Sequence, residues 1–140
     1  MGSVRWEEFF INIAERTALM SYATKRKVGC VAVINRSILD VGFNGTLAGA
    51  PSNDCEYFDE EGKLQTYDYV EHAERNLTSR CASRGTPLKG ATLYVTAAPC
   101  VECAKSLVNA GFVKVVYLQD YGHREGIELL ELHGVEVIKF

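Results

Sequence analysis

The sequence has no uninterrupted run of about 18 apolar residues, the length that a membrane-spanning helix needs. We expect no signal peptide either, because residues 1–8 are polar and acidic where such a peptide requires a basic start followed by an apolar run. These absences argue against membrane-spanning and secreted proteins. We therefore expect no membrane partner and a cytoplasmic location.

A surplus of positive charge is missing as well. The 140-residue chain carries 15 Lys and Arg against 18 Asp and Glu, a formal net charge of −3. Proteins that bind long nucleic acids usually present a basic face. The densest cationic cluster, Lys25-Arg26-Lys27, suits one phosphate group better than a duplex. We expect no nucleic acid polymer as a partner.

The cysteines do not have the number or context of a disulfide framework. There are five, and an odd count without a secretion signal favours a reducing compartment with free thiols. Cys30 lies in an apolar stretch and is interpreted as core packing. The remaining composition, 47% hydrophobic and 24% charged, is typical of one globular domain, which we expect to span 1–140.

The first half of the chain predicts a helix, a hairpin and a long irregular segment. Apolar residues at three-to-four-residue spacing predict a helix over 7–23. Apolar, β-branched stretches predict strands over 27–35 and 38–43, joined by a turn into a hairpin. Residues 46–68 are predicted to be irregular, and a loop of that length inside a small domain is usually functional.

The second half alternates helices and strands. The predicted segments are, in order, a helix over 70–83, a strand over 91–96, a helix over 100–110, a strand over 112–118, a helix over 124–133 and a strand over 135–140. Strand–helix–strand units form right-handed crossovers with parallel strands, whereas the first two strands form an antiparallel hairpin. The sequence thus predicts an α/β fold with a mixed five-stranded sheet and helices on both faces.

Two sequence motifs contain the candidate catalytic residues: His72-Ala73-Glu74 and, later in the chain, Pro99-Cys100-Val101-Glu102-Cys103. One imidazole and two thiols suit Zn²⁺, and three protein ligands leave the fourth tetrahedral position open for water, as in catalytic sites. Zinc lowers the pKa of such a water to about 7. Glu74 is placed to move protons without itself binding the metal.

Two other interpretations of these residues are disfavoured. A structural zinc site would normally recruit a fourth protein ligand, and no close second pair of ligands is present. A redox-active pair of cysteines would not need the upstream His72 and Glu74. The H-x-E and P-C-x-x-C pattern is the signature of zinc-dependent cytidine and adenosine deaminases, so catalytic zinc is favoured.

At these residues the sequence resembles the cytidine deaminase superfamily and, within it, the deoxycytidylate (dCMP) deaminase family. The resemblance extends from Ser21 to the C-terminus. Its marks are Lys27-Val28-Gly29, Gly42-Phe43-Asn44-Gly45, His72-Ala73-Glu74-Arg75-Asn76, Tyr94-Val95-Thr96 and Pro99-Cys100-Val101-Glu102-Cys103-Ala104-Lys105. It implies a cytidine-deaminase-like three-layer α/β/α fold and zinc-dependent hydrolysis of dCMP to dUMP and ammonia, which supplies dUMP for dTTP synthesis.

The resemblance also implies a homo-oligomer, often a hexamer, activated by dCTP and inhibited by dTTP, with Mg²⁺ accompanying the triphosphate effector. It places the effector site near Gly42, Phe43 and Gly45. Phe43 stands where the family has tyrosine, so a hydrogen bond from that hydroxyl is missing here. Some members hold a second zinc in the long loop, but this loop offers only Cys55, so we expect one Zn²⁺ per chain.

Three residues are predicted to bind the substrate. Asn44 would bond the deoxyribose 3′-hydroxyl, Arg26 would hold the phosphate in a two-pronged contact, and Tyr121 would line the base or phosphate pocket. For Arg26 and Tyr121, an ordinary surface position is an equally good interpretation.

Rival functions come from two classes. A tRNA adenosine deaminase or a nucleoside or free-base deaminase would share the zinc pattern. The acidic balance argues against tRNA, and the Gly42–Gly45 stretch together with the cationic cluster argues for a nucleotide. A catalytically silent regulatory subunit is the other alternative, disfavoured because His72, Glu74, Cys100 and Cys103 are all intact.

Overall fold

A computed structural model of the protein describes residues 4–140, so the first three residues of the polar N-terminus lie outside the described residues. The helices are α1 (Val4–Ala18), α2 (Ala73–Arg84), α3 (Val101–Ala110) and α4 (Glu125–Leu132). The strands are β1 (Gly29–Ile34), β2 (Ser37–Phe43), β3 (Gly45–Thr46), β4 (Glu56–Phe58), β5 (Leu64–Thr66), β6 (Val70–Glu71), β7 (Thr92–Ala97), β8 (Lys114–Gln119) and β9 (Glu136–Lys139). Within the described part, no helix combines the length and apolarity needed to cross a bilayer.

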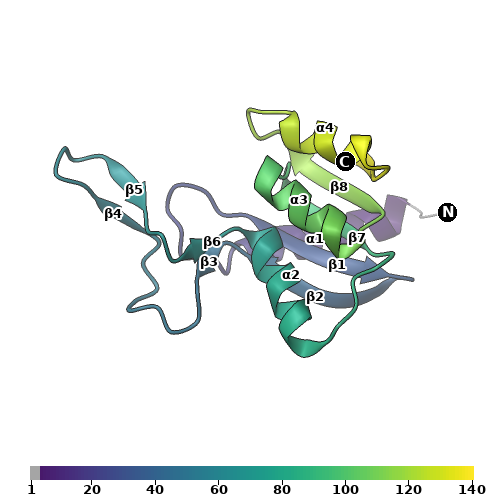
Figure 1. Ribbon diagram of the computed structural model, residues 1–140, viewed down its shortest axis with the longest axis horizontal. Helices are drawn as coiled ribbons and strands as arrows, with labels where there is room; N and C mark the ends of the chain where they lie inside the picture. The colour runs from purple at the N-terminus through teal and green to yellow at the C-terminus, as the bar shows by residue number, and fades with distance from the viewer. Residues whose placement is uncertain (1–3) are drawn as a thin grey trace.

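Five strands form the central sheet, in the order β2-β1-β7-β8-β9. Strand β1 runs antiparallel to both β2 and β7, whereas β7, β8 and β9 are parallel. Helices α2, α3 and α4 cover one face and α1 covers the other (Figure 1). The predicted mixed five-stranded sheet in a three-layer α/β/α fold is confirmed.

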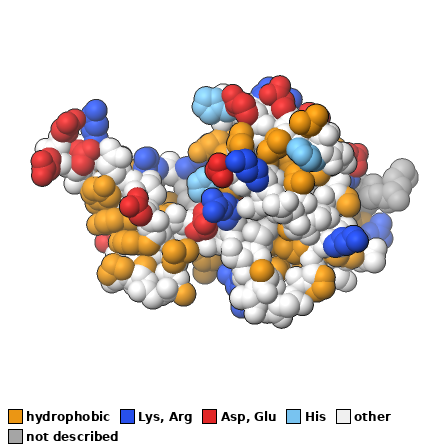
Figure 2. Space-filling model, in the orientation of Figure 1, with side chains coloured by type: hydrophobic (Ala, Val, Ile, Leu, Met, Phe, Trp, Pro, Cys, Tyr) orange, Lys and Arg blue, Asp and Glu red, His pale blue; other side chains and the backbone are white. Residues whose placement is uncertain are grey.

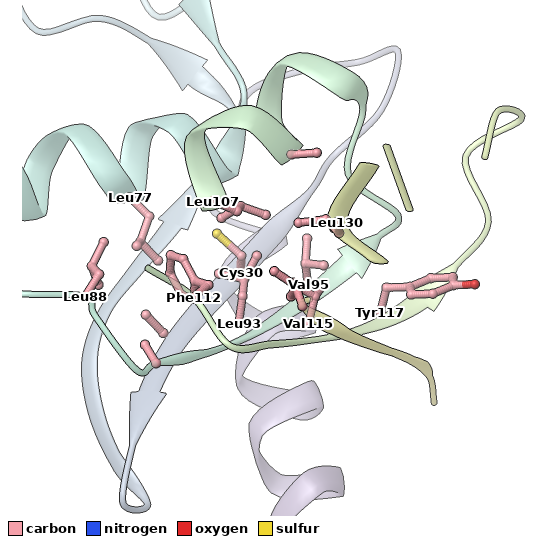
Figure 3. Packing of buried hydrophobic residues seen from close by; sticks show 14 of the residues in the cluster. Cys30, Leu77, Leu88, Leu93, Val95, Leu107, Phe112, Val115, Tyr117 and Leu130 are labelled. Atoms are coloured by element: carbon pink, nitrogen blue, oxygen red, sulfur yellow. The ribbon is translucent and has the colours of Figure 1, made fainter. Parts of the chain in front are cut away.

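The larger part of the core lies between the sheet and helices α2 to α4. Leu77, Leu107 and Leu130, one from each helix, are fully buried against Leu93 and Val115 of the sheet (Figure 3). A smaller cluster lies under α1, where the buried residues are Phe10, Ile11, Ala14, Val31, Val33, Tyr94 and Val116. Burial on both faces explains why β1, β7 and β8 are nearly continuously apolar.

Helix α1 ends earlier than predicted, at Ala18 rather than Ala23. Ser21 provides the physical reason. Its hydroxyl donates to the Asn44 carbonyl at 2.7 Å and accepts from the Ala23 N–H at 3.1 Å. These bonds lead the chain away from the helix towards the end of β2, so the prediction over 19–23 was wrong because a tertiary contact overrode the local periodicity.

Helix α2 begins at Ala73, three residues later than predicted. Strand β6 occupies the expected first turn, because Val70 and Glu71 pair with Thr46 and Gly45 of β3. His72 therefore lies at the N-cap with extended backbone angles, φ −69° and ψ 153°. This shift places the imidazole at the helix end instead of on its side.

The segment over 46–68 was predicted to be irregular, which is wrong for its second half. Strands β4 and β5 form a hairpin that projects away from the sheet (Figure 1). Its turn is closed by Asp59, whose carboxylate accepts from the N–H groups of Glu61 and Lys63, both at 2.9 Å. An aspartate at the start of a turn with Gly62 behind it was a readable signal for this hairpin.

Candidate functional site

His72, Cys100 and Cys103 converge at the N-terminal ends of two helices. His72 caps α2 and Cys100 caps α3, and neither side chain bonds its own helix end. Cys103 lies in the first turn of α3 and is fully buried. The Nδ1 atom of His72 lies 3.2 Å from the Cys103 sulfur and 3.5 Å from the Cys100 sulfur. The three donor atoms all lie within 4.8 Å of one another.

This donor set fits a zinc ion. Zn–N bonds of about 2.0 Å and Zn–S bonds of about 2.3 Å at tetrahedral angles separate a nitrogen and a sulfur by about 3.5 Å. The observed separations of 3.2 and 3.5 Å are close to this value. Within residues 4–140, no fourth histidine, cysteine or carboxylate joins the cluster. Three protein donors leave a coordination position for a non-protein ligand, as in catalytic zinc sites.

The pKa values of the two cysteines shift in opposite directions. The Cys103 thiol donates to the Cys100 sulfur, and His72 donates to it as well, so the pKa of Cys100 falls to about 3. The same thiol contact, together with burial, raises the pKa of Cys103 well above its usual value. The pKa of His72 is raised, chiefly by its hydrogen bond to Cys100. The thiolate form of Cys100 is thus favoured where two helix N-termini point.

Glu74 lies beside the cluster, on the first turn of α2. Its side chain is only 4% exposed. Burial removes solvent from the carboxylate and raises its pKa to about 7, although the nearby His72 acts in the opposite direction. A carboxyl group with a pKa near neutrality both accepts and donates a proton readily at physiological pH.

One cavity is lined by six of the residues predicted from the sequence: Arg26, Asn44, His72, Glu74, Cys100 and Tyr121. Arg26 lies at its rim, where the guanidinium carbon stacks 4.4 Å from the centre of the Tyr121 ring. Arg26 also donates to the Asp120 carbonyl at 3.4 Å. The structure therefore brings a cationic group and the candidate metal donors to the same opening.

The comparisons with known proteins agree with this geometry. Residues 4–119 match the model of the cytidine and deoxycytidylate deaminase zinc-binding region. The chain belongs to this family. It is 35% identical to ComE operon protein 2 of Bacillus subtilis over 98% of this chain and 72% of that protein. It is 35% identical to the deoxycytidylate deaminase of Mycobacterium phage D29 over 84% of this chain and 97% of that protein.

A solved structure of a family member is also similar. The dCMP deaminase of cyanophage S-TIM5, in complex with dCMP and dUMP, superposes with a TM-score of 0.92. The two chains are 36% identical, and the match covers all of both. The cytidine-deaminase-like fold predicted from the sequence is that of this relative.

In this deaminase-family protein, Asn44 holds the chain around Arg26. The Asn44 amide oxygen accepts from the Val28 N–H at 2.8 Å, and its amide nitrogen donates to the Arg26 carbonyl at 2.7 Å. One N–H and one oxygen lone pair of the amide are left for other partners. A bond to a sugar hydroxyl, the role predicted for Asn44, would use these.

The predicted effector stretch lies behind the cavity. A β-carbon added at Gly42 would lie 2.5 Å from the Ala73 carbonyl, so this glycine lets β2 and the start of α2 approach closely. Gly45 pairs with Glu71 in the β3–β6 ladder. The Phe43 carbonyl accepts from Asn76 at 3.0 Å. None of Gly42, Phe43 and Gly45 lines the cavity, so effector contact at these residues stays a prediction.

Sequence reasoning missed part of the cavity wall. Glu56 and Thr66 come from the β4–β5 hairpin, and Glu71 from β6. A local signal existed only for Glu71, because it lies next to His72 and accepts from the His72 N–H at 2.9 Å. Glu56 and Thr66 reach the site only through the hairpin fold.

Proposed function

We propose that this protein catalyses the hydrolytic deamination of dCMP to dUMP and ammonia and thereby supplies dUMP for dTTP synthesis. The observation that carries the proposal is that one cavity is lined by two members of the metal-donor cluster, His72 and Cys100, together with a buried carboxyl group and an arginine. The similarity to a dCMP deaminase solved with dCMP and dUMP supports the choice of substrate.

His72, Cys100 and Cys103 would hold one Zn²⁺ per chain. When bound, zinc supplies Lewis-acid activation of the water that attacks the ring. Glu74 takes a proton from that water and delivers it to the neighbouring ring nitrogen. The new C–O bond forms at the carbon that bears the exocyclic amine. Glu74 then takes the proton of the new hydroxyl group and delivers it to the amine, so that the C=O bond forms as the C–N bond breaks and ammonia leaves.

The remaining residues orient the nucleotide. Arg26 donates two parallel N–H groups to the 5′-phosphate, a geometry that guanidinium offers and ammonium does not. Its stacking on Tyr121 holds the guanidinium plane at the cavity rim. Asn44 donates to the 3′-hydroxyl of the deoxyribose while it holds the backbone on both sides of Lys27. A single cationic rim suits a monophosphate rather than a polymer.

The proposal extends to regulation and assembly. By its resemblance to dCMP deaminases, the protein would form a homohexamer that dCTP activates, together with Mg²⁺, and dTTP inhibits. The Gly42–Gly45 stretch adjoins the cavity through Asn44, which supports a route from an effector to the substrate site.

The decisive experiment is an ammonia-release assay on the zinc-loaded protein with dCMP, deoxycytidine, dCTP, adenosine and an adenosine-containing tRNA anticodon stem. Each substrate is tested alone and with dCTP or dTTP. Preferential turnover of dCMP supports the proposal. Faster release from the tRNA stem or from a nucleoside would assign another deaminase activity, and no release from any substrate would favour a silent regulatory subunit. Size-exclusion chromatography with light scattering tests the hexamer.

A further inference from the structure

Glu56, at the start of β4, binds a backbone segment that lies 31 and 32 residues earlier in the chain. Both of its carboxylate oxygens accept from the Thr24 N–H at 3.1 Å. One oxygen also accepts from the Lys25 N–H at 3.2 Å, and the other from the Thr24 hydroxyl at 3.2 Å. A carboxylate that accepts several N–H bonds makes strong, charge-assisted contacts.

The segment that Glu56 holds has no regular secondary structure of its own. Residues 21–28 connect the end of α1 to β1 without a helix or strand. Glu56 fixes this segment at Thr24 and Lys25, and Asn44 fixes it at Arg26 and Val28. The backbone around Arg26 is therefore held by hydrogen bonds from two side chains, Glu56 and Asn44, that lie later in the sequence.

The charge of Glu56 has two possible consequences for an anion in the cavity, which Glu56 also lines. A free carboxylate would repel a phosphate. A carboxylate that already accepts hydrogen bonds from two backbone N–H groups and a hydroxyl has its negative charge partly neutralised. It then stabilises the segment that carries Lys25 and Arg26. The number of contacts favours the second consequence.

We propose that Glu56 is a positioning residue for recognition of the substrate phosphate, acting through Arg26, and that the β4–β5 hairpin is thereby a specificity element of the site. This inference rests on the proposed function for the identity of the anion. Aromatic contacts support the base of the hairpin: the Tyr57 and Tyr67 rings are tilted with centres 4.6 Å apart, and the Tyr67 and Tyr69 rings are stacked with centres 4.8 Å apart. Charged side chains gather at the hairpin tip, away from the main body (Figure 2).

The first test measures, without any substrate, the hydrogen bonds that Thr24 and Lys25 donate to Glu56. Amide hydrogen exchange of the zinc-loaded protein is followed by NMR in wild type, Glu56→Ala, Glu56→Gln and Glu60→Gln, the last an exposed control at the hairpin tip. In Glu56→Ala we expect exchange at Thr24 and Lys25 to quicken about tenfold or more, because both amides lose their acceptor. The Val28 amide, bonded to Asn44, should be unchanged. Unaltered exchange at Thr24 and Lys25 would show that Glu56 does not hold this segment, and the inference would be wrong.

The second test measures how the loss of the Glu56 hydrogen bonds changes binding of the substrate phosphate. Glu56→Ala should raise KM for dCMP about tenfold, the size of one weakened charge-assisted bond, with kcat within about twofold. Turnover of deoxycytidine, which has no phosphate, should be unchanged. Glu56→Gln keeps one acceptor oxygen and should lie between wild type and Glu56→Ala, whereas Glu60→Gln should match wild type.

The outcomes separate this inference from the proposed function. If both Glu56 variants lower KM for dCMP, the carboxylate acts by repulsion and the positioning role is wrong. If wild type deaminates dCMP but Glu56→Ala affects dCMP and deoxycytidine equally, the inference fails while the proposed function stands. If wild type releases no ammonia from dCMP, the proposed function fails, and the phosphate role of Glu56 fails with it.

Discussion

Gly126 and Pro99 touch where helix α4 meets the loop before α3. A β-carbon added at Gly126 would lie 2.1 Å from the Pro99 carbonyl oxygen and 2.9 Å from the Cys100 carbonyl carbon. The buried first turn of α4 thus packs directly against the backbone of a candidate zinc ligand. Only glycine allows this approach, because contacts below 3 Å require the backbone to move.

Gly126→Ala should therefore weaken zinc binding as well as the fold. We expect a loss of about 1–3 kcal/mol in the free energy of unfolding, typical of overpacking. A further loss of zinc affinity should follow from displacement of Cys100. Urea unfolding with and without zinc, combined with a competitive zinc titration, measures both. The control is Glu128→Ala on the exposed side of the same helix. An unchanged zinc affinity would show that α4 does not position Cys100.

Cys100→Ala should abolish stoichiometric zinc binding. The remaining His72 and Cys103 offer two donors, too few for the tetrahedral sites in which proteins hold zinc. Elemental analysis of the purified protein should give about one zinc per chain in wild type and far less in the variant. Cys81→Ala removes a buried thiol outside the cluster and should keep its zinc. Equal metal content in Cys100→Ala and wild type would remove Cys100 from the ligand set.

Glu74→Gln should retain zinc and lose turnover. The amide has nearly the same shape as the carboxyl group but cannot carry a proton between water, ring nitrogen and amine, a loss worth about 10²–10⁴-fold in rate. Ammonia release and metal analysis on the same sample separate the two effects. A variant with near-normal kcat would assign proton transfer to another group.

Glu74 should also make the stability of the metal-free protein depend on pH. Its folded-state pKa is raised by burial from 4.5 to about 7, so the folded protein binds this proton more tightly than the unfolded chain. The contribution of Glu74 to stability therefore declines as pH rises from about 4.5 through 7, by about 3 kcal/mol in all. Glu74→Gln lacks this penalty and should be more stable than wild type at pH 8.

The control for this pH effect is the same comparison at pH 4.5, where wild-type Glu74 is largely neutral and the two proteins should match. Added zinc should shrink the difference at pH 8, because a nearby cation favours the charged carboxylate. Urea unfolding at both pH values, with and without zinc, gives the four measurements. A constant difference across pH would contradict the raised pKa.

Arg26→Ala should raise KM for dCMP by about 10–100-fold, the worth of a charge-assisted two-pronged contact. Deoxycytidine, which lacks the phosphate, should be almost unaffected. Arg26→Lys keeps the charge but not the planar fork and should be intermediate. Arg5→Ala, an exposed arginine on α1, is the matched control. Similar effects of Arg26→Ala on both substrates would refute the phosphate role.

The sequence predicted the central sheet well because its signals are local. Residues of β1, β7 and β8 are apolar and β-branched over short runs, and glycines follow α2 and α3, where Gly85 and Gly111 adopt left-handed angles. The predictions failed at the end of α1 and the start of α2. In both places hydrogen bonds to the region after β2, from Ser21 and from the β3–β6 pair, displaced a helix boundary.

The sequence by itself determined which residues the candidate site contains, since the H-x-E and P-C-x-x-C patterns place His72, Glu74, Cys100 and Cys103 at short, fixed spacings. Only the tertiary structure decided which residues from distant parts of the chain lie around this site. Glu56 accepts hydrogen bonds from Thr24 and Lys25, next to Arg26, and Gly126 packs against the backbone of Pro99 and Cys100. Such contacts depend on how elements that are distant in sequence pack together, and the spacing of residues along the chain does not predict that packing.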